Sequence, residues 1–268
     1  MDNRYCVILG SSDKVGENQG WTHYFYTSSY YRSARRPGGS SDDWELYPNI
    51  RRHEMTLENK RENRSALEVI DDPYYIGASP SPNNSDNDLG QYGDAAYTAL
   101  TLIMSRTNPQ IATALTGAQL AYQLLDNSEG GKQSDKIRYA WDYGRADKCE
   151  AINYCHFIVR TYEDYRKAEV RVWMNGNSSF ATVGGSLSFN IYVDPYNNND
   201  FESTDHGSSS LSDMNEAEKR QYMEKSPDFK KIPHDEIEDD YKKELANGEA
   251  IYRALNPQVT IESKTHSE

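Results

Sequence analysis

The six histidines are the first residues to consider for catalysis or metal binding, because a histidine side chain changes its charge near neutral pH. No two of them have the spacing of metal ligands, and they stand at positions 23, 53, 156, 206, 234 and 266. Asp205–Ser208 contains Asp, His and Ser, but neighbours in sequence do not have the geometry of a catalytic triad. The chain contains no nucleophile elbow, phosphate-binding loop, dinucleotide-binding glycine motif or HExxH. We therefore predict no catalytic residues and no enzyme activity.

An oxygen-rich loop offers a second kind of chemistry, the binding of Ca²⁺. Asn84, Asp86 and Asp88 alternate along the chain, and Gly90 follows them. Calcium loops place oxygen ligands at alternate positions before a glycine, and they end with a bidentate Glu at the twelfth position. Here the glycine comes one residue late and the twelfth position is not Glu. The pattern predicts a weak Ca²⁺ site at Asn84, Asp86 and Asp88 or a solvated linker, and it indicates no other cofactor.

The three cysteines argue against a disulfide scaffold, because such scaffolds use a larger and even number of cysteines. On one straight strand Cys149 and Cys155 would lie roughly 20 Å apart, which is too far for a bond. A pair therefore requires a turn between these two residues, or a bond from one of them to Cys6.

Tyrosine is unusually frequent, with 21 residues, and it suits partly exposed strands and contact surfaces. Five aromatic residues in predicted strands are candidates for a contact face: Tyr139, Trp141, Tyr143, Trp173 and Tyr192. Strands rich in tyrosine also occur without any partner, so both interpretations stay open.

Alternating apolar and polar residues after residue 136 predict an antiparallel β-meander, because such alternation is typical of strands with one face on a core. The predicted strands are 137–143, 151–162, 170–174, 180–183 and 187–193. Asn175-Gly176 and Gly184-Gly185 favour tight turns, and they predict hairpin corners within 170–193.

Residues 94–127 differ from their surroundings, because Arg106 is the one charged residue between the aspartates at the two ends. Asn108 and Pro109 favour the start of a second helix there. A membrane span needs about 20 apolar residues, and each of the two helical segments is shorter. We predict a buried helical hairpin packed on the β-meander, which is an α+β fold with a sheet or a small sandwich. The alternative is a hairpin over 95–125 that inserts into membranes.

The two ends of the chain are more polar, and we expect them to be less ordered. Residues 1–93 form the first predicted region, with a short strand at Arg4–Leu9 and a helix over Met55–Val69. Residues 94–193 form the predicted core, and residues 194–268 form a polar connector followed by an amphipathic helix over His234–Leu255. Asp213 and Glu216 have the spacing of a capping box, which predicts a further short helix.

The net charge of −13 argues against binding to nucleic acid. The first residues contain no apolar run long enough for a secretory signal, and the composition slightly favours an extracellular or virion protein over a cytoplasmic one. We predict a non-enzymatic structural or interaction protein that contacts protein partners, or copies of itself, through tyrosine-rich β faces. The alternative is a membrane-active, toxin-like protein that uses the apolar hairpin.

Overall fold

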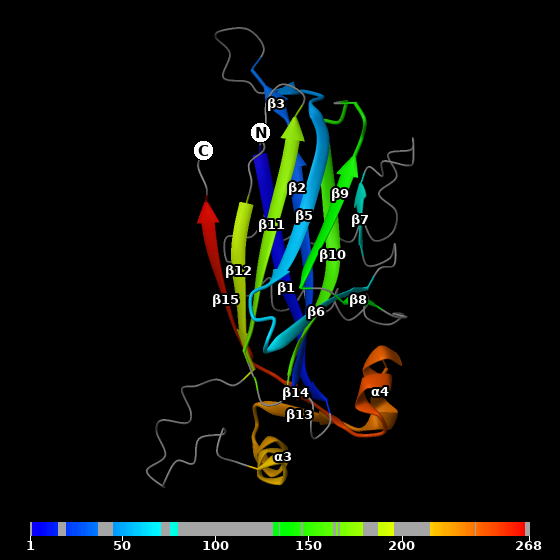
Figure 1. Cartoon of the computed structure of the whole chain (residues 1–268), viewed down its shortest axis with the longest axis vertical. Coiled ribbons are helices and arrows are strands. Elements are labelled where there is room, and N and C mark those ends of the chain that lie inside the picture. The colour runs from blue at the N-terminus through cyan, green and yellow to red at the C-terminus, as the bar shows by residue number, and fades with distance from the viewer. Residues whose placement is uncertain are drawn as a thin grey trace.

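The computed structural model describes residues 2–15, 20–36, 45–70, 76–79, 131–133, 135–145, 147–162, 165, 167–178, 187–195, 215–238 and 240–265. These residues form three sheets in which every strand pair is antiparallel (Figure 1). The two large sheets lie face to face, so the described chain is mainly a β-sandwich.

The larger sheet has eight strands. Seven of them are hydrogen-bonded in the order β13 (Phe229–Ile232), β14 (Ile251–Ala254), β1 (Asp2–Val15), β2 (Trp21–Arg32), β10 (Glu150–Thr161), β6 (Ser65–Ile70) and β8 (Gly131–Gln133). The eighth strand, β7 (Ile76–Ser79), pairs with β10 as well.

The smaller sheet has five strands in the order β15 (Gln258–Thr265), β12 (Leu187–Asp194), β11 (Ala168–Ser178), β5 (Ile50–Asn59) and β9 (Lys136–Asp142). A separate pair joins β3 (Ala34–Arg35) to β4 (Glu45–Leu46).

The main core lies between the two large sheets, and strand alternation selects its side chains. In β11, Val170 and Val172 are fully buried, whereas Arg171 between them is partly exposed on the opposite face. In β10, Phe157 faces the same core and stacks on Phe25 of β2, with 5.0 Å between the ring centres. Each sheet thus covers the apolar face of the other, which is the usual arrangement of a sandwich.

The described helices are short and lie beside the larger sheet, at the lower end of Figure 1. They are α3 (Glu216–Lys225), a 3₁₀ turn at His234–Glu236, and α4 (Asp240–Ala246). Met223 of α3 packs with Trp21 and Phe229 in a second, smaller core. A short helix was predicted here, but its capping box is formed by Asn215 and Glu218.

The predicted α+β class is wrong, because the described chain is mostly antiparallel β-structure with short helices at one end. The prediction assigned the cover of the meander to an apolar helical hairpin. Instead, the two large sheets cover each other: β1, β2 and β6 from the N-terminal region belong to the larger sheet, and β5 belongs to the smaller one. The residues of the hairpin, 94–127, lie outside the described residues.

Two predicted helices are also wrong. Residues 55–69 form the end of β5, a turn and β6, because Met55 and Leu57 alternate onto the core in a strand. The side chain of Asn59 closes that turn with hydrogen bonds to Ser65. Residues 234–255 contain the 3₁₀ turn, α4 and β14. The chain leaves α4 through Asn247 and Gly248, which both have positive φ angles that end a helix.

The strands predicted at 137–143, 151–162, 170–174 and 187–193 are confirmed. The hairpin turn predicted at Asn175-Gly176 is wrong, because both residues lie inside β11 and pair with Glu54 and His53 of β5. The chain reverses later, between β11 and β12, since Met174 pairs with Leu187. Residues 180–183 and Gly184-Gly185 lie outside the described residues.

The N-terminal strand contains a bulge. The strand predicted at Arg4–Leu9 continues as β1 to Val15, and Leu9 pairs with Phe25 while Ser11 pairs with Tyr24. Gly10 is therefore an extra residue between two successive pairs, which is the definition of a β-bulge. Residues 10–13 therefore lie inside β1, beyond the end of the predicted strand.

Candidate functional site

The five predicted contact residues divide between the two faces of the smaller sheet. Tyr139, Trp141 and Tyr143 lie on its inner face, partly buried against the core, and the Tyr139 and Trp141 rings stack 6.2 Å apart. Trp173 and Tyr192 lie on the outer face, since their neighbours in the strands are the core residues. The Ca²⁺ candidates Asn84, Asp86 and Asp88 lie outside the described residues.

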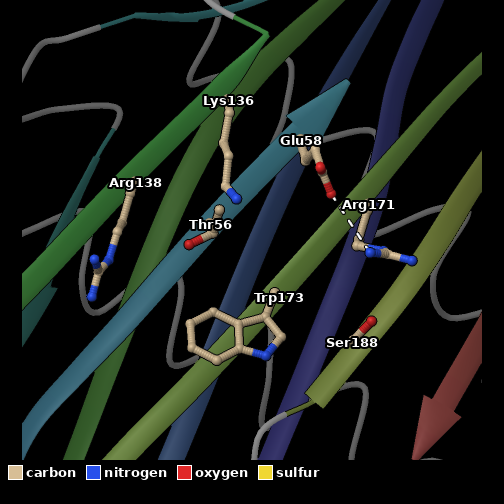
Figure 2. A pocket seen from close by; sticks show the side chains of 7 residues that line it. All are labelled: Thr56, Glu58, Lys136, Arg138, Arg171, Trp173 and Ser188. Atoms are coloured by element: carbon tan, nitrogen blue, oxygen red, sulfur yellow. Dashed lines mark ion pairs between the residues drawn. The ribbon is translucent and has the colours of Figure 1, made fainter. Parts of the chain in front are cut away.

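An open hollow of about 530 Å³ lies on this outer face. Strands β5, β9, β11 and β12 supply its lining residues, which are Thr56, Glu58, Lys136, Arg138, Arg171, Trp173 and Ser188. Figure 2 shows Trp173 between Thr56 and Ser188, with the three basic side chains around it. Trp173 pairs across the sheet with both of these small residues, which leave space beside its ring.

Strand register brings the basic residues of the hollow together. Arg138 of β9 pairs with Thr56 of β5, and Thr56 pairs in turn with Trp173 of β11. Arg171 precedes Trp173 by two residues, so both side chains point to the same face. This alternation predicts the core residues on the inner face. The same alternation places Lys136 and Arg138 of β9, and Arg171 and Trp173 of β11, on the outer face. These basic and aromatic residues at every second position were the sequence feature that could have indicated this site.

Two carboxylates offset part of the positive charge. Glu54 is 4% exposed and lies 2.7 Å from Arg138 and 2.7 Å from Arg52. Glu58, in the hollow itself, lies 3.7 Å from Arg171 and 3.5 Å from Lys60. Three basic side chains and one carboxylate line the hollow, so its charge is positive on a chain with a net charge of −13.

Two carboxylates lie near Tyr192 on the outer face, and one of them, Glu169, is paired with Arg61 at 2.9 Å. Partial desolvation, followed by the nearby carboxylates of Glu169 and Glu262, raises the pKa of Tyr192. Tyr192 pairs with Glu169 of β11 on one side and with Thr260 of β15 on the other. The two outer aromatic residues therefore have different neighbours: basic side chains predominate around Trp173, whereas two carboxylates lie near Tyr192.

His53 lies at the centre of a buried polar cluster inside the sandwich. Asn153 donates to its Nδ1 at 3.4 Å, so the neutral ring carries its proton on Nε2, which lies 3.0 Å from the Tyr143 hydroxyl. Tyr31 and Trp141 both meet the imidazole edge to face. Burial lowers the pKa of His53 to about 3, so the ring is neutral at physiological pH. This arrangement supports a structural role, because the imidazole is fully buried.

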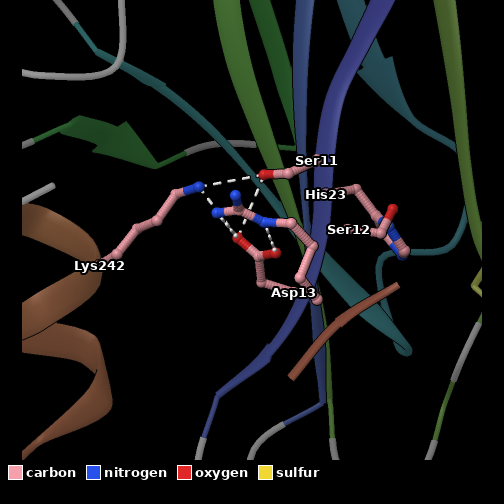
Figure 3. Close-up of polar contacts among 6 residues, drawn as sticks. Ser11, Ser12, Asp13, His23 and Lys242 are labelled. Atoms are coloured by element: carbon pink, nitrogen blue, oxygen red, sulfur yellow. Dashed lines mark hydrogen bonds and ion pairs between the residues drawn. The ribbon is translucent and has the colours of Figure 1, made fainter. Parts of the chain in front are cut away.

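A second buried cluster contains the residue types of a catalytic triad without its geometry. The Ser12 hydroxyl lies 2.8 Å from Nδ1 of His23, and both side chains are fully buried. The neighbouring Asp13 points to the other side of β1, as Figure 3 shows, where it binds Lys242 and Arg253. The Ser–His pair is thus closed to solvent and separated from the carboxylate, and it forms a structural hydrogen bond.

Lys242 of α4 is 3% exposed and donates to Asp13 at 2.9 Å and to Ser11 at 3.0 Å. Its ammonium also lies 3.8 Å from the ring centre of Tyr24, a cation–π contact. Burial alone would raise the pKa of Asp13, but the positive charges of Lys242 and Arg253 outweigh burial and lower it. This ion cluster joins two parts of the chain more than 200 residues apart in sequence, so no local pattern could have predicted it.

Cys149 and Cys155 are both free thiols, so these two residues do not form a disulfide. Burial raises the pKa of the Cys155 thiol, which keeps it protonated. No group of three or more His, Cys, Asp or Glu residues with metal-binding geometry occurs in the part of the chain that the structure describes. Within the same part of the chain, no helix is long and apolar enough to cross a membrane.

The outer-face hollow is therefore the candidate functional site, a positively charged depression around one tryptophan. Comparison of the chain with models of known protein families and with curated proteins finds no match.

Proposed function

We propose that this protein is a non-enzymatic interaction protein that binds an acidic segment of a protein partner in the outer-face hollow. The observation that carries the proposal is the position of Trp173 among Lys136, Arg138 and Arg171 on an open sheet face. The sequence predicted contacts through aromatic β faces in general, and this proposal assigns them to the part of the outer face around Trp173.

Charge favours an acidic ligand. Arg138 and Arg171 come from different strands and flank the hollow on two sides, so an acidic segment that crosses the hollow can place one carboxylate near each of them. Their carboxylate partners, Glu54 and Glu58, hold the guanidinium groups in place, which lowers the entropy lost on binding. The remaining surface carries net negative charge, so the hollow is a local exception that orients an acidic partner.

The residue types favour a protein as the partner. Trp and Arg are the side chains that most often dominate the free energy of protein–protein binding, since they combine a large apolar surface with directed hydrogen bonds. Thr56 and Ser188 add small polar side chains beside the Trp173 ring. A nucleic acid would be repelled by the chain as a whole, given its net charge of −13.

A peptide titration tests this proposal. The probe is a fluorescein-labelled peptide of alternating Glu and Phe, and a peptide of alternating Lys and Phe serves as the comparison. Binding of the acidic peptide should weaken about tenfold or more in Arg138→Glu and in Arg171→Glu, because each reversal replaces attraction by repulsion. Trp173→Ala should weaken it by a similar factor, the size expected for a hot-spot aromatic residue.

The matched control is Lys230→Glu, an equal charge change at an exposed position of β13 in the other sheet. This variant should bind the acidic peptide nearly as the parent chain does. The proposal fails if the parent chain binds both peptides equally, or if Lys230→Glu weakens binding as much as the two substitutions in the hollow.

A further inference from the structure

The C-terminal strand β15 forms one edge of the smaller sheet, as its outermost position beside β12 in Figure 1 shows. It runs for eight residues and pairs with β12 along its whole length. In the described part of the chain, no strand pairs with the opposite edge of β15. Backbone N–H and C=O groups at such an edge can pair with a further strand.

The side chains of β15 make this edge unusual. Val259 is 39% exposed and Ile261 is 43% exposed, although their partners in β12, Val193 and Ile191, are each 1% exposed. All four side chains point to the inner side of the sheet, because paired residues share a face. The apolar inner face therefore continues past β12 to β15, where it loses its cover.

The reason lies in the larger sheet. On the side of β1 away from β2, its described neighbour is β14, which pairs with Asp13–Val15 and with no earlier residue of β1. Along most of the length of β1, the described larger sheet therefore ends at β1, with no further strand beside it. A strand in that place would extend the cover toward β15, and its absence from the described chain accounts for the exposure of Val259 and Ile261.

The outermost strands at the other three ends of the two sheets are short or covered. The edge of β1 before Asp13 is also unpaired in the described chain, but Val7 and Ile8 there are only 8% and 2% exposed. Strand β8 has three residues, and β13 has four, with Phe229 packed against α3. At the far edge of the smaller sheet, β9 has seven residues, and its inward-facing Ile137 is 3% exposed. Of these edges, β15 alone combines a long strand with exposed aliphatic side chains, which natural proteins avoid unless a partner covers them.

We propose that two copies of this chain pair through β15, antiparallel and about a two-fold axis, to form one continuous ten-stranded sheet from two five-stranded ones. In this arrangement Ile261 faces Ile261 of the second copy, and the apolar inner faces of both copies meet at the axis. This pairing uses a different surface from the outer-face hollow, so it stands independently of the proposed function.

The register follows from the sequence of β15. A two-fold axis perpendicular to the sheet pairs residues of the same face. An axis centred at Ile261 pairs Glu262 of one copy with Thr260 of the other. The two β15 strands then overlap over more residues than they would with the axis at Thr260. Centring it at Glu262 would place two carboxylates opposite each other, which is unfavourable. The axis at Ile261 combines a long overlap with no facing like charges.

Sedimentation equilibrium tests the pairing in the full chain. Between about 5 and 500 µM, the weight-average mass of the parent chain should rise toward that of a dimer, since one strand pair is a small and reversible interface. Ile261→Lys should stay monomeric over that range, because two ammonium groups would face each other at the axis. Ile261 is 43% exposed in the single chain, so the fold tolerates the change.

The matched control is Thr260→Lys, an equal charge change on the neighbouring residue of the same strand. In the proposed register this lysine faces Glu262 of the second copy, so the dimer should persist or strengthen. A parent chain that stays monomeric throughout, or an Ile261→Lys variant that dimerises like the parent, would overturn the pairing.

Disulfide trapping tests the register itself. In a background with Cys6→Ser and Cys149→Ser, mild oxidation of Ile261→Cys should convert most of the dimer to a covalent form, because the two Cβ atoms face each other. Thr260→Cys in the same background should give several-fold less. Equal trapping by both cysteines would contradict the axis at Ile261.

Discussion

At the scale of single residues, two buried histidines connect the fold to pH. Burial lowers the pKa of His53 to about 3, and burial together with the charge of Lys242 lowers the pKa of His156 to about 3. In the unfolded chain both residues return to a pKa near 6.5. Between these pH values the unfolded chain binds protons that the folded chain does not bind, so acid favours unfolding.

The free energy of unfolding should therefore fall as the pH drops from 6.5 toward 3, by up to about 1.4 kcal/mol per pH unit for each histidine. Urea unfolding at pH 7 and at pH 5 measures this slope. In His53→Gln, the free energy of unfolding should fall less steeply with pH, because the contribution of this histidine is missing. This holds whatever the stability of the variant at pH 7. A slope unchanged in His53→Gln would mean that this histidine is protonated in the folded state as well.

Single positions of the candidate site were partly predictable from sequence. Trp173 and Tyr192 were predicted as aromatic residues of strands, and the structure has them in β11 and β12, partly buried. Tyr139, Trp141 and Tyr143 also stand at alternate positions of a predicted strand. Alternation shows that they share one face, but it does not show whether that face is covered by the other sheet, and in the structure it is. The basic residues around Trp173 come from several strands, so their proximity depends on the strand register.

At the scale of elements, the ion cluster around Asp13 holds α4 against β1 and β14 of the larger sheet. Asp13 is fully buried and binds both Lys242 of α4 and Arg253 of β14. The partners are not equivalent. Without Asp13, Lys242 is left buried without a counter-charge, whereas without Lys242 the carboxylate still binds Arg253 at 2.9 Å.

Asp13→Asn should therefore lower the free energy of unfolding by about 3–5 kcal/mol, the usual effect of leaving one buried charge unpaired. Lys242→Met should cost clearly less, and the double variant should recover much of the stability lost in Asp13→Asn. Urea unfolding of the parent, both single variants and the double variant completes the cycle. Additive effects would show that Asp13 and Lys242 do not depend on each other.

Elements were predicted well where alternation was strong and poorly where it was masked by charge. The strands after residue 136 alternate clearly, and the structure confirms four of them. Residues 55–69 contain a run of charged residues that resembles the exposed face of a helix, yet the run covers the end of β5 and the turn before β6. The Asn175-Gly176 pair favours a turn locally, but its pairing with β5 is stronger than that preference.

At the scale of the whole molecule, salt should act on the two proposed contacts in opposite ways, because the chain has a net charge of −13 whereas the hollow is positive. Two copies repel each other through their overall charge, so salt should strengthen the β15 pairing by screening that repulsion. The hollow attracts an acidic peptide through Arg138 and Arg171, so salt should weaken peptide binding. Raising NaCl from about 50 to 500 mM should therefore change the two dissociation constants several-fold in opposite directions.

Sedimentation equilibrium and peptide titration at the same salt concentrations measure both effects on one preparation. Ile261→Lys provides the control, because it should abolish self-association and leave the salt dependence of peptide binding unchanged. If salt weakens both contacts, charge attraction and not apolar contact holds the two copies together.

The extra residue in β1 determines which groups meet outside the sandwich. Val7 points to the main core, and unbroken alternation would send every later odd-numbered side chain of the strand the same way, Asp13 included. The insertion at Gly10 reverses that parity, so that Asp13 emerges beside α4. If Gly10 took a regular place in the pairing with β2 instead of forming the bulge, the carboxylate of Asp13 would turn to the inner face of the sheet, away from the lysine of α4. The position of the bulge, at a residue with no side chain, therefore decides where the C-terminal helix attaches.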